Sequence, residues 1–445
     1  MPQQQYKSVL KFLIPSLLGA AFFLLPVAGE NTVTIPLAIV VDYLRSALSE
    51  WLPTVAVIVI LTGFVVTAIA ALFPKLWTGS IPDRWNRLLR PGLFWILVRL
   101  VGAVIALAAF TGLGPEILSS AAVGGVLLND LAPILLVLFL IAGFLIVLLT
   151  DYGLMEFIGV LAAPLFRSLF KVPGRGAIDA TASWMGSATV GTLITIEQYQ
   201  AGKYTGREAA TVACNFSIAS IGFCYVLAAT AGVEQWFLPL YGTVFVCVVI
   251  SAIILCRVPP LTMIPDTLID GSERPADEHT SRGFRAAMSE ATQRAETGPG
   301  VKAFFSQGLY SVASIYIGLL PSVFAIGGLG LLLAETTPIF EWLSAPLVPV
   351  LSGLGLPEAA QAAPAFIVGF ADQFLTVIVG SNVESEQTRF VIAVAAITQV
   401  LYFSELGALL LQSRIPIGFG HLTLVFVLRT LITIPIAAAA SHLLF

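Results

Sequence analysis

The chain has 445 residues, of which 58% are hydrophobic and only 11% are charged, and its formal net charge is −4. Soluble domains carry about 25% charged residues, so a water-soluble protein of this length is excluded. The apolar runs are continuous and about 20 residues long, which fits membrane-spanning helices and not the short alternating strands of a membrane β-barrel. The composition therefore predicts an all-α polytopic membrane protein that lies in a lipid bilayer, and the negative charge argues against a nucleic-acid partner.

Nine apolar segments are predicted to span the membrane. They cover residues 12–29, 52–73, 92–111, 131–150, 207–231, 235–257, 304–334, 386–411 and 417–440. The first follows Lys7 and Lys11 and resembles a signal peptide, but further apolar spans come after it, so we expect an uncleaved first span. Residues 34–48 are too short and too charged to span, and they are expected to form an interfacial helix on the external face.

Basic residues predict the orientation of these spans, because Lys and Arg gather on the cytoplasmic side. Segments 74–91, 151–175 and 258–302 carry several bases and are placed inside, whereas 112–130 and 335–358 carry acids without a base and are placed outside. This arrangement puts the N-terminus in the cytoplasm. We expect a multi-pass protein of the bacterial cytoplasmic (inner) membrane.

The same arrangement requires two segments that do not cross the membrane. Residues 176–202 must enter and leave from the cytoplasm, and residues 359–384 must dip in from outside, each as a re-entrant helical hairpin. Arg389 then falls on the external side. Both segments are rich in Gly, Ala and Ser, which fits a broken helix.

A repeated succession of features supports this pairing. Leu161-Ala-Ala-Pro164 and Arg207 recur about 182 residues later as Leu343-Ser-Ala-Pro346 and Arg389. An inverted pair of broken hydrophobic segments indicates a small-solute site near the middle of the membrane. We therefore expect two inverted-topology repeats, each with a re-entrant hairpin. The predicted parts are an N-terminal scaffold (1–130), a first repeat (131–257), a flexible cytoplasmic linker (258–302) and a second, inverted repeat (303–445).

Polar residues near the two hairpins are the candidate solute ligands. They are Ser187, Thr189, Asn215, Ser217 and Ser220 in the first copy, and Asp372, Gln373, Gln399 and Tyr402 in the second. Asp372 and Glu405 are the candidate coupling-ion residues, because a carboxylate inside a membrane is costly and usually functional. For any single Ser or Thr, a hydrogen bond between helices is an equally good interpretation.

Three further sets of residues have structural interpretations that need no role in transport. Asp179 and Glu197 flank the first hairpin break and could be coupling carboxylates, but we favour interfacial groups near the cytoplasmic mouth. Arg99 and Arg429 lie inside apolar runs, where we expect them to snorkel to the interface or to pair with an acid. Thr205 is expected to cap the helix that follows it.

Catalysis has no support in the sequence. Walker, GxSxG, HExxH and kinase motifs are absent, the four cysteines form no CxxC pair, and the three histidines are far apart. We therefore expect neither an enzyme nor a metal or cofactor site. The driving force would be a gradient, with Na+ or H+ as the coupling ion.

Several short motifs resemble a known family. Lys11-Phe-Leu-Ile-Pro-Ser16, Thr34-Ile-Pro36, Ser183-Trp-Met-Gly-Ser187, Tyr204-Thr-Gly-Arg-Glu208 and Asn215-Phe-Ser217 resemble the bacterial YjiH family of nucleoside recognition, or Gate domain, membrane proteins. The half after residue 303 is similar to the companion YjiG-type unit. Gate domains also occur in concentrative nucleoside transporters, in the ferrous-iron permease and in spore-maturation membrane proteins.

The resemblance implies a function. It suggests that residues 1–130 are partly scaffold, that the protein is a homo-oligomer and that the repeats move as an elevator-like unit. Nucleoside transporters carry a Gln-Thr-Glu cluster at the first hairpin, where this chain has Gly-Ser-Ala-Thr at 186–189. We expect a gradient-driven transporter of a small polar organic solute: a nucleoside or base, an amino-acid derivative, or a dipeptide. The alternative is a non-transporting assembly or partner protein of the spore-maturation type, with 258–302 as its docking surface.

Overall fold

The computed structural model describes residues 2–25, 27–28, 33–73, 82–185, 188–273, 283–402 and 406–445. Its regular secondary structure is helical apart from two paired two-residue strands, β1 (Val27–Ala28) and β2 (Val33–Thr34). The expected all-α class is therefore confirmed. Six helices are long and apolar enough to cross a membrane among the described residues, or seven if one bent pair counts as a span.

The N-terminal part is a set of packed helices. It contains α1 (Pro2–Leu24), α2 (Pro36–Ala47), α3 (Leu52–Leu72), α4 (Asp83–Leu89), α5 (Leu93–Thr111), α6 (Glu116–Ser119), the π-helix η2 (Ala121–Leu131) and α7 (Ala132–Thr150). Helices α3 and α5 expose large apolar side chains such as Ile58 and Val104, as a surface facing lipid would. By contrast, α7 is buried over every residue from Ala132 to Phe139, so it lies inside the bundle.

The segment predicted as the first repeat, residues 131–257, begins with α7 and continues with a helix that packs along a hairpin. It contains α8 (Leu154–Phe170), α9 (Gly176–Met185), α10 (Ala188–Gln200), α11 (Gly206–Phe216), α12 (Ile221–Thr230), the 3-10 turn η3 (Glu234–Trp236) and α13 (Phe237–Leu255). Thr205 caps α11 as expected: its hydroxyl accepts from Glu208 N, and the Glu208 carboxylate accepts from Thr205 N. The predicted span 207–231 is broken, because the backbone leaves the helix between Phe216 and Ile221, with a 45° bend.

The segment predicted as the second repeat is also helical. It contains α15 (Val301–Ser314), the π-helix η5 (Ile315–Leu319), α16 (Leu320–Thr336), α17 (Ile339–Ser344), η6 (Ala345–Leu347), α18 (Val348–Gly353), α19 (Ala359–Val368), α20 (Gln373–Gly380), α21 (Glu386–Thr398), α22 (Ala408–Gln412) and α23 (Phe419–Leu444). The predicted span 386–411 is not continuous, because α21 ends at Thr398. Val400 then adopts a left-handed φ of 62°, which is strained for a β-branched residue and stops the helix.

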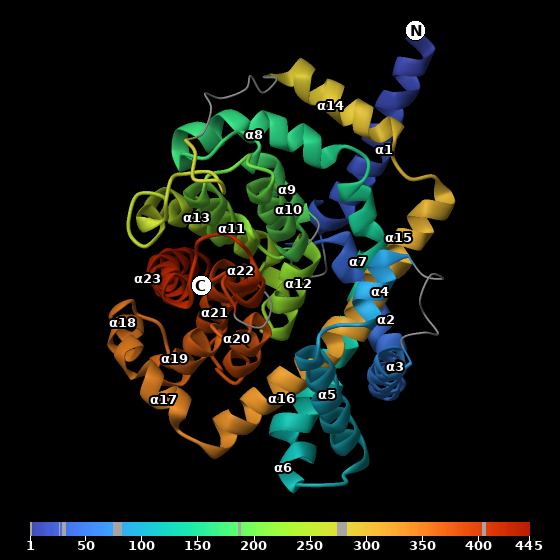
Figure 1. The fold of residues 1–445 in the computed structure, drawn as a ribbon. Helices are drawn as coiled ribbons and strands as arrows, with labels where there is room; N and C mark the ends of the chain where they lie inside the picture. The colour runs from blue at the N-terminus through green and yellow to red at the C-terminus, as the bar shows by residue number, and fades with distance from the viewer. Residues whose placement is uncertain are drawn as a thin grey trace.

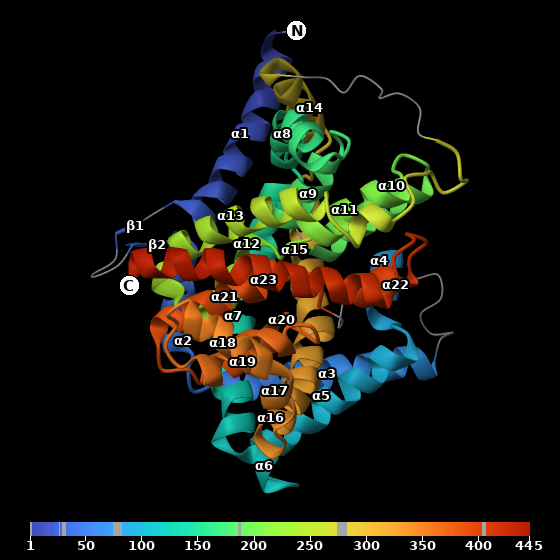
Figure 2. The same cartoon turned by 90° about the vertical axis from the view of Figure 1, so that its left-hand side faces the viewer.

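The helices divide into two groups in space. In Figure 1, α8 to α13 and α17 to α23 lie together, and α3, α5 and α16 lie to one side of them. Helix α16 packs closely on α5, where a Cβ at Gly102 would collide with the Pro321 carbonyl. Figure 2 shows α13 and α23 side by side across the bundle.

The described part of the segment between α13 and α15 is more ordered than the expected flexible linker. It contains the 3-10 turn η4 (Leu261–Met263) and α14 (Phe284–Glu296), which packs against α1 and α8 (Figure 1). Arg294 Nη2 lies 2.6 Å from Asp151 Oδ1 and its Nε lies 3.5 Å from Glu156 Oε1. Ser8 donates to Glu296 at 2.6 Å. Composition alone suggests a flexible chain here, but these charges are used in contacts with the protein's own helices.

Candidate functional site

Both segments that were expected to be re-entrant are helical hairpins. Hairpin one consists of α9 and α10, and hairpin two consists of α19 and α20. The arms of hairpin one cross closely at Gly191, where a Cβ would collide with Ser183 Oγ. At the open end of hairpin two, Gln361 Nε2 donates to Asn382 O at 2.9 Å, and the Glu358 carboxylate accepts from Glu384 N at 2.8 Å.

The two hairpins open at opposite ends of the bundle. Trp236, just before α13, packs on Phe445, just after α23, with ring centroids 4.9 Å apart. Nearer the middle of both helices, Cys247 Sγ lies 4.0 Å from Thr433 O, so α13 and α23 run antiparallel. Hairpin one opens near the start of α23, where Gly206 packs against Pro416. Hairpin two opens near the other end of α23, where His442 Nε2 lies 2.8 Å from Leu354 O. These contacts are what an inverted repeat requires, and the repeat relation itself stays a prediction.

The hairpin tips pack on equivalent helices in a matching way. Trp184 at the end of α9 stacks edge-on against Phe245 of α13, with centroids 5.5 Å apart. Phe370, which follows α19, packs against Phe426 of α23 at 5.1 Å. The tip of hairpin one therefore contacts the first half of α13, and the tip of hairpin two contacts the first half of α23. Aromatic pairs of this kind add about 0.5–1.5 kcal/mol beyond burial and hold the tips in place.

Arg429 of α23 occupies the point where the two broken helices end. It is fully buried, and its Nε donates to Thr398 O, the last residue of α21, at 2.7 Å. Its Nη1 donates to Asn215 Oδ1 at 3.1 Å and to Cys214 O at 3.3 Å, in the last turn of α11. One guanidinium thus binds the carbonyl ends of two helices, where the helix dipoles are negative.

This arrangement corrects the expectation for the two buried arginines. Arg429 neither snorkels nor pairs with an acid in the part of the chain that the structure describes, because backbone carbonyls and an amide oxygen take the place of a carboxylate. Arg99 is also buried, and its Nη1 donates to Thr67 Oγ1 at 2.6 Å and to Leu88 O at 3.0 Å. In both cases the guanidinium is long enough to reach acceptors inside the bundle.

Four buried polar atoms of α20, Gln399 and Arg429 have no hydrogen-bond partner among the residues that the structure describes. They are Gln373 Nε2, Thr376 Oγ1, Gln399 Oε1 and Arg429 Nη2. A Cβ at Gly369 would collide with Gln399 Oε1 and would stand 2.5 Å from Thr376 Oγ1, so these two atoms converge on the tip of hairpin two. Gln373 lies one turn before Thr376 and therefore shares its face of α20. We call these four residues the polar cluster.

Several predicted ligands fall at this place. Asn215 binds Arg429, and Gln399 Nε2 donates to Phe366 O at 2.9 Å and to Thr430 Oγ1 at 3.0 Å, leaving its oxygen unused. Gln373 belongs to the polar cluster itself. The structure therefore brings residues from α11, α20, α21 and α23 to one region.

Other predicted ligands have local partners. Ser217 accepts from Thr192 Oγ1 at 2.7 Å, which ties hairpin one to the break after α11. Ser220 caps α12, and Asp372 caps α20 through a 2.8 Å bond from Phe374 N. Thr189 is half-buried and Tyr402 is buried. Ser187 and Glu405 lie outside the described residues.

Sequence reasoning did not single out Arg429, Thr376 or Thr430 as site residues. A signal was present for Arg429, because an arginine near the middle of a 26-residue apolar helix is as costly as the aspartate that was singled out. Asp179 is buried inside hairpin one, in the first turn of α9. Glu197 is exposed.

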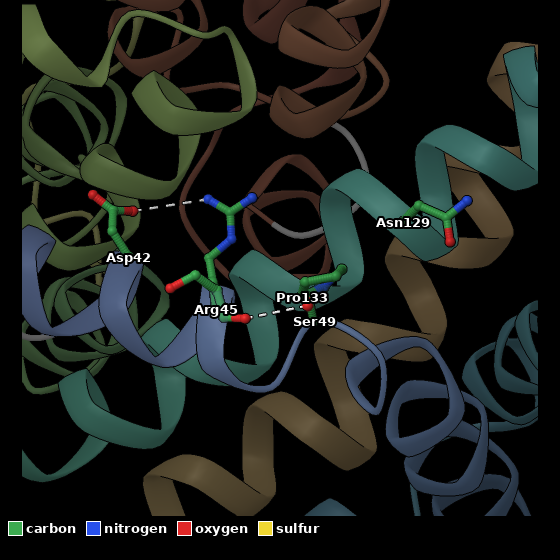
Figure 3. A pocket seen from close by; sticks show the side chains of 6 residues that line it. Asp42, Arg45, Ser49, Asn129 and Pro133 are labelled. Carbon is green, nitrogen blue, oxygen red and sulfur yellow. Dashed lines mark hydrogen bonds and ion pairs between the residues drawn. The ribbon is translucent and has the colours of Figure 1, made fainter.

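A separate depression lies between α2, η2 and α7 (Figure 3). It is lined by Asp42, Arg45, Ser46, Ser49, Asn129 and Pro133. Asp42 and Arg45 form an ion pair of 3.9 Å within α2, and Ser49 donates to Ser46 O. Its polar groups bind one another near the surface, so it lacks the unpaired buried atoms of the polar cluster.

The fold and the site define a polytopic α-helical membrane protein with paired helical hairpins. The model of the Gate family, described as nucleoside recognition, matches residues 132–234, which contain α7 to α12. An uncharacterised protein of Alkalihalophilus pseudofirmus is 42% identical over 444 residues, covering 98% of this chain and 95% of that protein. The chain belongs to the same family as this protein, and the expected Gate-domain membership is confirmed.

A solved structure is similar in outline. It is that of a double variant of CNTnw in an outward-facing state, which covers 98% of this chain and 100% of its own, with a TM-score of 0.42 and 13% identity.

Proposed function

We propose that the protein is a gradient-driven membrane transporter of a small polar organic solute, which binds at the polar cluster. The observation that carries the proposal is the pair of buried atoms Thr376 Oγ1 and Gln399 Oε1, which converge at Gly369 and have no partner among the described residues. Gln373 lies on the same face of α20, and Arg429 binds Thr398 O next to Gln399. Leaving a buried donor or acceptor unpaired costs about 1–3 kcal/mol. A solute that pairs with these atoms would recover this cost.

The atoms define the kind of solute. Gln399 Oε1 accepts, Gln373 Nε2 and Arg429 Nη2 donate, and the Thr376 hydroxyl does either. A molecule with a carbonyl or carboxylate oxygen beside an N–H group is complementary to this set. Nucleosides and bases, amino-acid derivatives and dipeptides all carry such a pair. The cationic Arg429 favours the members of these classes that present an oxygen with negative character.

Broken helices and hairpins also support movement. Irregular backbone inside a membrane persists only where protein or water shields it, and discontinuous helices of this kind line transporter sites. The spatial grouping of hairpins and broken helices apart from α3 and α5 fits an elevator-like motion against a scaffold. Asp372 stays a candidate coupling residue, although its role as the cap of α20 already explains its charge.

The test is a screen followed by a flux measurement. Purified protein is heated with a panel of nucleosides, bases, amino-acid derivatives and dipeptides, because a ligand that binds only the folded form raises Tm. A solute found in this way should show saturable uptake into proteoliposomes. Gln399→Leu should lower uptake at least tenfold, whereas Gln387→Leu, on the same helix three turns away, should not. Equal uptake by both variants would contradict the assignment.

The alternative of a non-transporting partner protein depends on residues 258–302 as a docking surface. In this structure the described helix of that segment is held by α1 and α8 of the same chain. Its visible contacts therefore support a structural role. A deletion of residues 284–296 that abolished binding of a membrane partner while uptake was absent in the wild type would favour the alternative.

A further inference from the structure

Asp179 is the one carboxylate that is buried among the residues the structure describes, with 2% of its surface exposed. It lies in the first turn of α9. Its Oδ2 accepts from Tyr204 Oη at 2.8 Å and from Thr195 Oγ1 of α10 at 3.1 Å. No Lys or Arg of the described chain lies within ion-pair distance. A buried carboxylate without a cationic partner is costly unless hydrogen bonds satisfy it or it takes up a proton.

The charged groups around Asp179 do not replace an ion pair. Arg175 lies one turn earlier and is half-buried, and its charge favours the ionised carboxylate although no ion pair with Asp179 forms among the described residues. Glu208 of α11 is used in the cap with Thr205. On α8, Arg167 lies beside Gly174 and Glu156 faces Arg294. Glu197 of α10 is exposed, and the adjoining part of α7 carries no charge. Tyr204, fully buried, is thus the titratable group in direct contact with Asp179.

The hydroxyl of Thr195 has two acceptors within reach but only one proton. Its oxygen lies 3.1 Å from Asp179 Oδ2 and 3.1 Å from Gly191 O. When Asp179 is ionised, Thr195 and Tyr204 both donate to it. When Asp179 is protonated, it donates to Thr195 Oγ1, and Thr195 turns its proton to Gly191 O. Both protonation states therefore leave every one of these groups paired.

Protonation would also change how firmly hairpin one is held. Asp179 joins three parts of the chain: α9, α10 and the segment that leads into α11. Hydrogen bonds to an ionised carboxylate are about twice as strong as those between neutral groups. On the same face of α10, one turn before Thr195, Thr192 binds Ser217 at the helix break. A proton on Asp179 therefore weakens the contacts that tie hairpin one to the broken helix.

From this geometry we propose that Asp179 is a proton-binding residue of the transport cycle, and that its protonation releases hairpin one. The proposal rests on the proposed function, since it gives the coupling ion of that transport. The carboxylate takes one proton from water on one side of the membrane and returns it to water on the other, and no other bond is made or broken.

The first test needs no solute. Infrared difference spectra of the purified full-length protein are recorded across an acid titration, together with hydrogen exchange of residues 176–204. The wild type should gain a protonated-carboxyl band, and the protection of this segment relative to its intrinsic exchange rate should fall at acidic pH. Asp179→Asn should lose that band and the pH dependence, whereas Glu197→Gln, an exposed carboxylate of the same hairpin, should keep both.

A conservative variant keeps the test decisive if Asp179→Asn does not fold. Tyr204→Phe removes one donor to the ionised form, so the carboxyl band should appear at a higher pH than in the wild type. A band and an exchange pattern that are the same in wild type, Asp179→Asn and Tyr204→Phe would overturn the proposal. The proposal would also be overturned if the protection of wild-type hairpin one, relative to its intrinsic exchange rate, did not depend on pH.

The second test separates this proposal from the proposed function. With a solute found in the thermal screen, Asp179→Asn should lose accumulation driven by an acid-outside gradient but should keep solute exchange across the membrane. If Asp179→Asn still accumulates the solute against its concentration gradient, the proton-binding role of Asp179 is contradicted and the transport function is not. If the wild type shows the expected titration of Asp179 but no solute flux, the proposed transport function is contradicted and the proton binding by Asp179 is not.

Discussion

Replacing Arg429 by leucine is the sharpest test of how the broken helices are held. The substitution removes the donors to Thr398 O at 2.7 Å and to Asn215 Oδ1 at 3.1 Å, which are the two shortest bonds of the guanidinium. Each acceptor left without a partner costs about 1–3 kcal/mol, and the cation also offsets two helix dipoles at about 0.3–1 kcal/mol each. The removed charge no longer has to be desolvated, which returns part of this sum. We expect a net loss of about 2–5 kcal/mol in the free energy of unfolding.

The assay is unfolding in mixed micelles, followed by the tryptophan signal, for Arg429→Leu, Arg429→Lys and Arg99→Leu. The lysine ammonium is a point charge without the branched donors of a guanidinium, so it can bind the carbonyl end of one helix but not of both. Arg429→Lys should therefore recover only part of the lost free energy of unfolding. Arg99→Leu should also destabilise, because it leaves Thr67 and Leu88 O without their donor, but it should not change a ligand-induced rise in Tm. A stability of Arg429→Leu equal to that of the wild type would refute the reasoning.

Three further outcomes follow from single contacts. Gly369→Ala should remove the ligand-induced rise in Tm, because the added methyl group fills the space on which the polar cluster converges, whereas Gly353→Ala, with nothing within 4 Å, should keep it. Arg294→Gln should speed hydrogen exchange in α14, whereas Arg285→Gln, at an exposed position, should not. Each ion pair of Arg294 contributes about 0.2–1 kcal/mol, and this contribution should fall as the salt concentration rises. Thr205→Ala should cost about 0.5–2 kcal/mol in the unfolding of α11 and Thr205→Ser much less, and equal losses would contradict the capping role.

The two hairpins could be predicted because they follow from local composition, whereas the breaks after α11 and α21 lie inside segments predicted as continuous spans. Gly191 lets the two arms of hairpin one pack so closely that a methyl group at this position would collide with Ser183 Oγ. Ser220 caps α12, where the helix resumes after the break. Small and hydroxyl-bearing residues in an apolar run are therefore direct marks of a broken helix. Thr205 and Glu208 mark the start of α11 in the same local way.

The role of Arg429 could not be predicted from the sequence, because its partners are backbone carbonyls. Thr398 and Cys214 lie 31 and 215 residues away, and nothing in their side chains marks them as ligands of a cation. The burial of Asp179 was missed for a related reason. It depends on Tyr204 folding back over α9, which is a tertiary contact without a pattern in the sequence.

The central claim is that two hairpins enter from opposite faces and meet a shared polar region. It is tested most directly by cysteine labelling at their open ends, in a variant without the four buried cysteines. Lys203→Cys and Asn382→Cys both place a thiol at an exposed position. In sealed vesicles of known orientation, an impermeant maleimide should label the first from one face only and the second from the other face only. Labelling of both thiols from the same face would contradict the account.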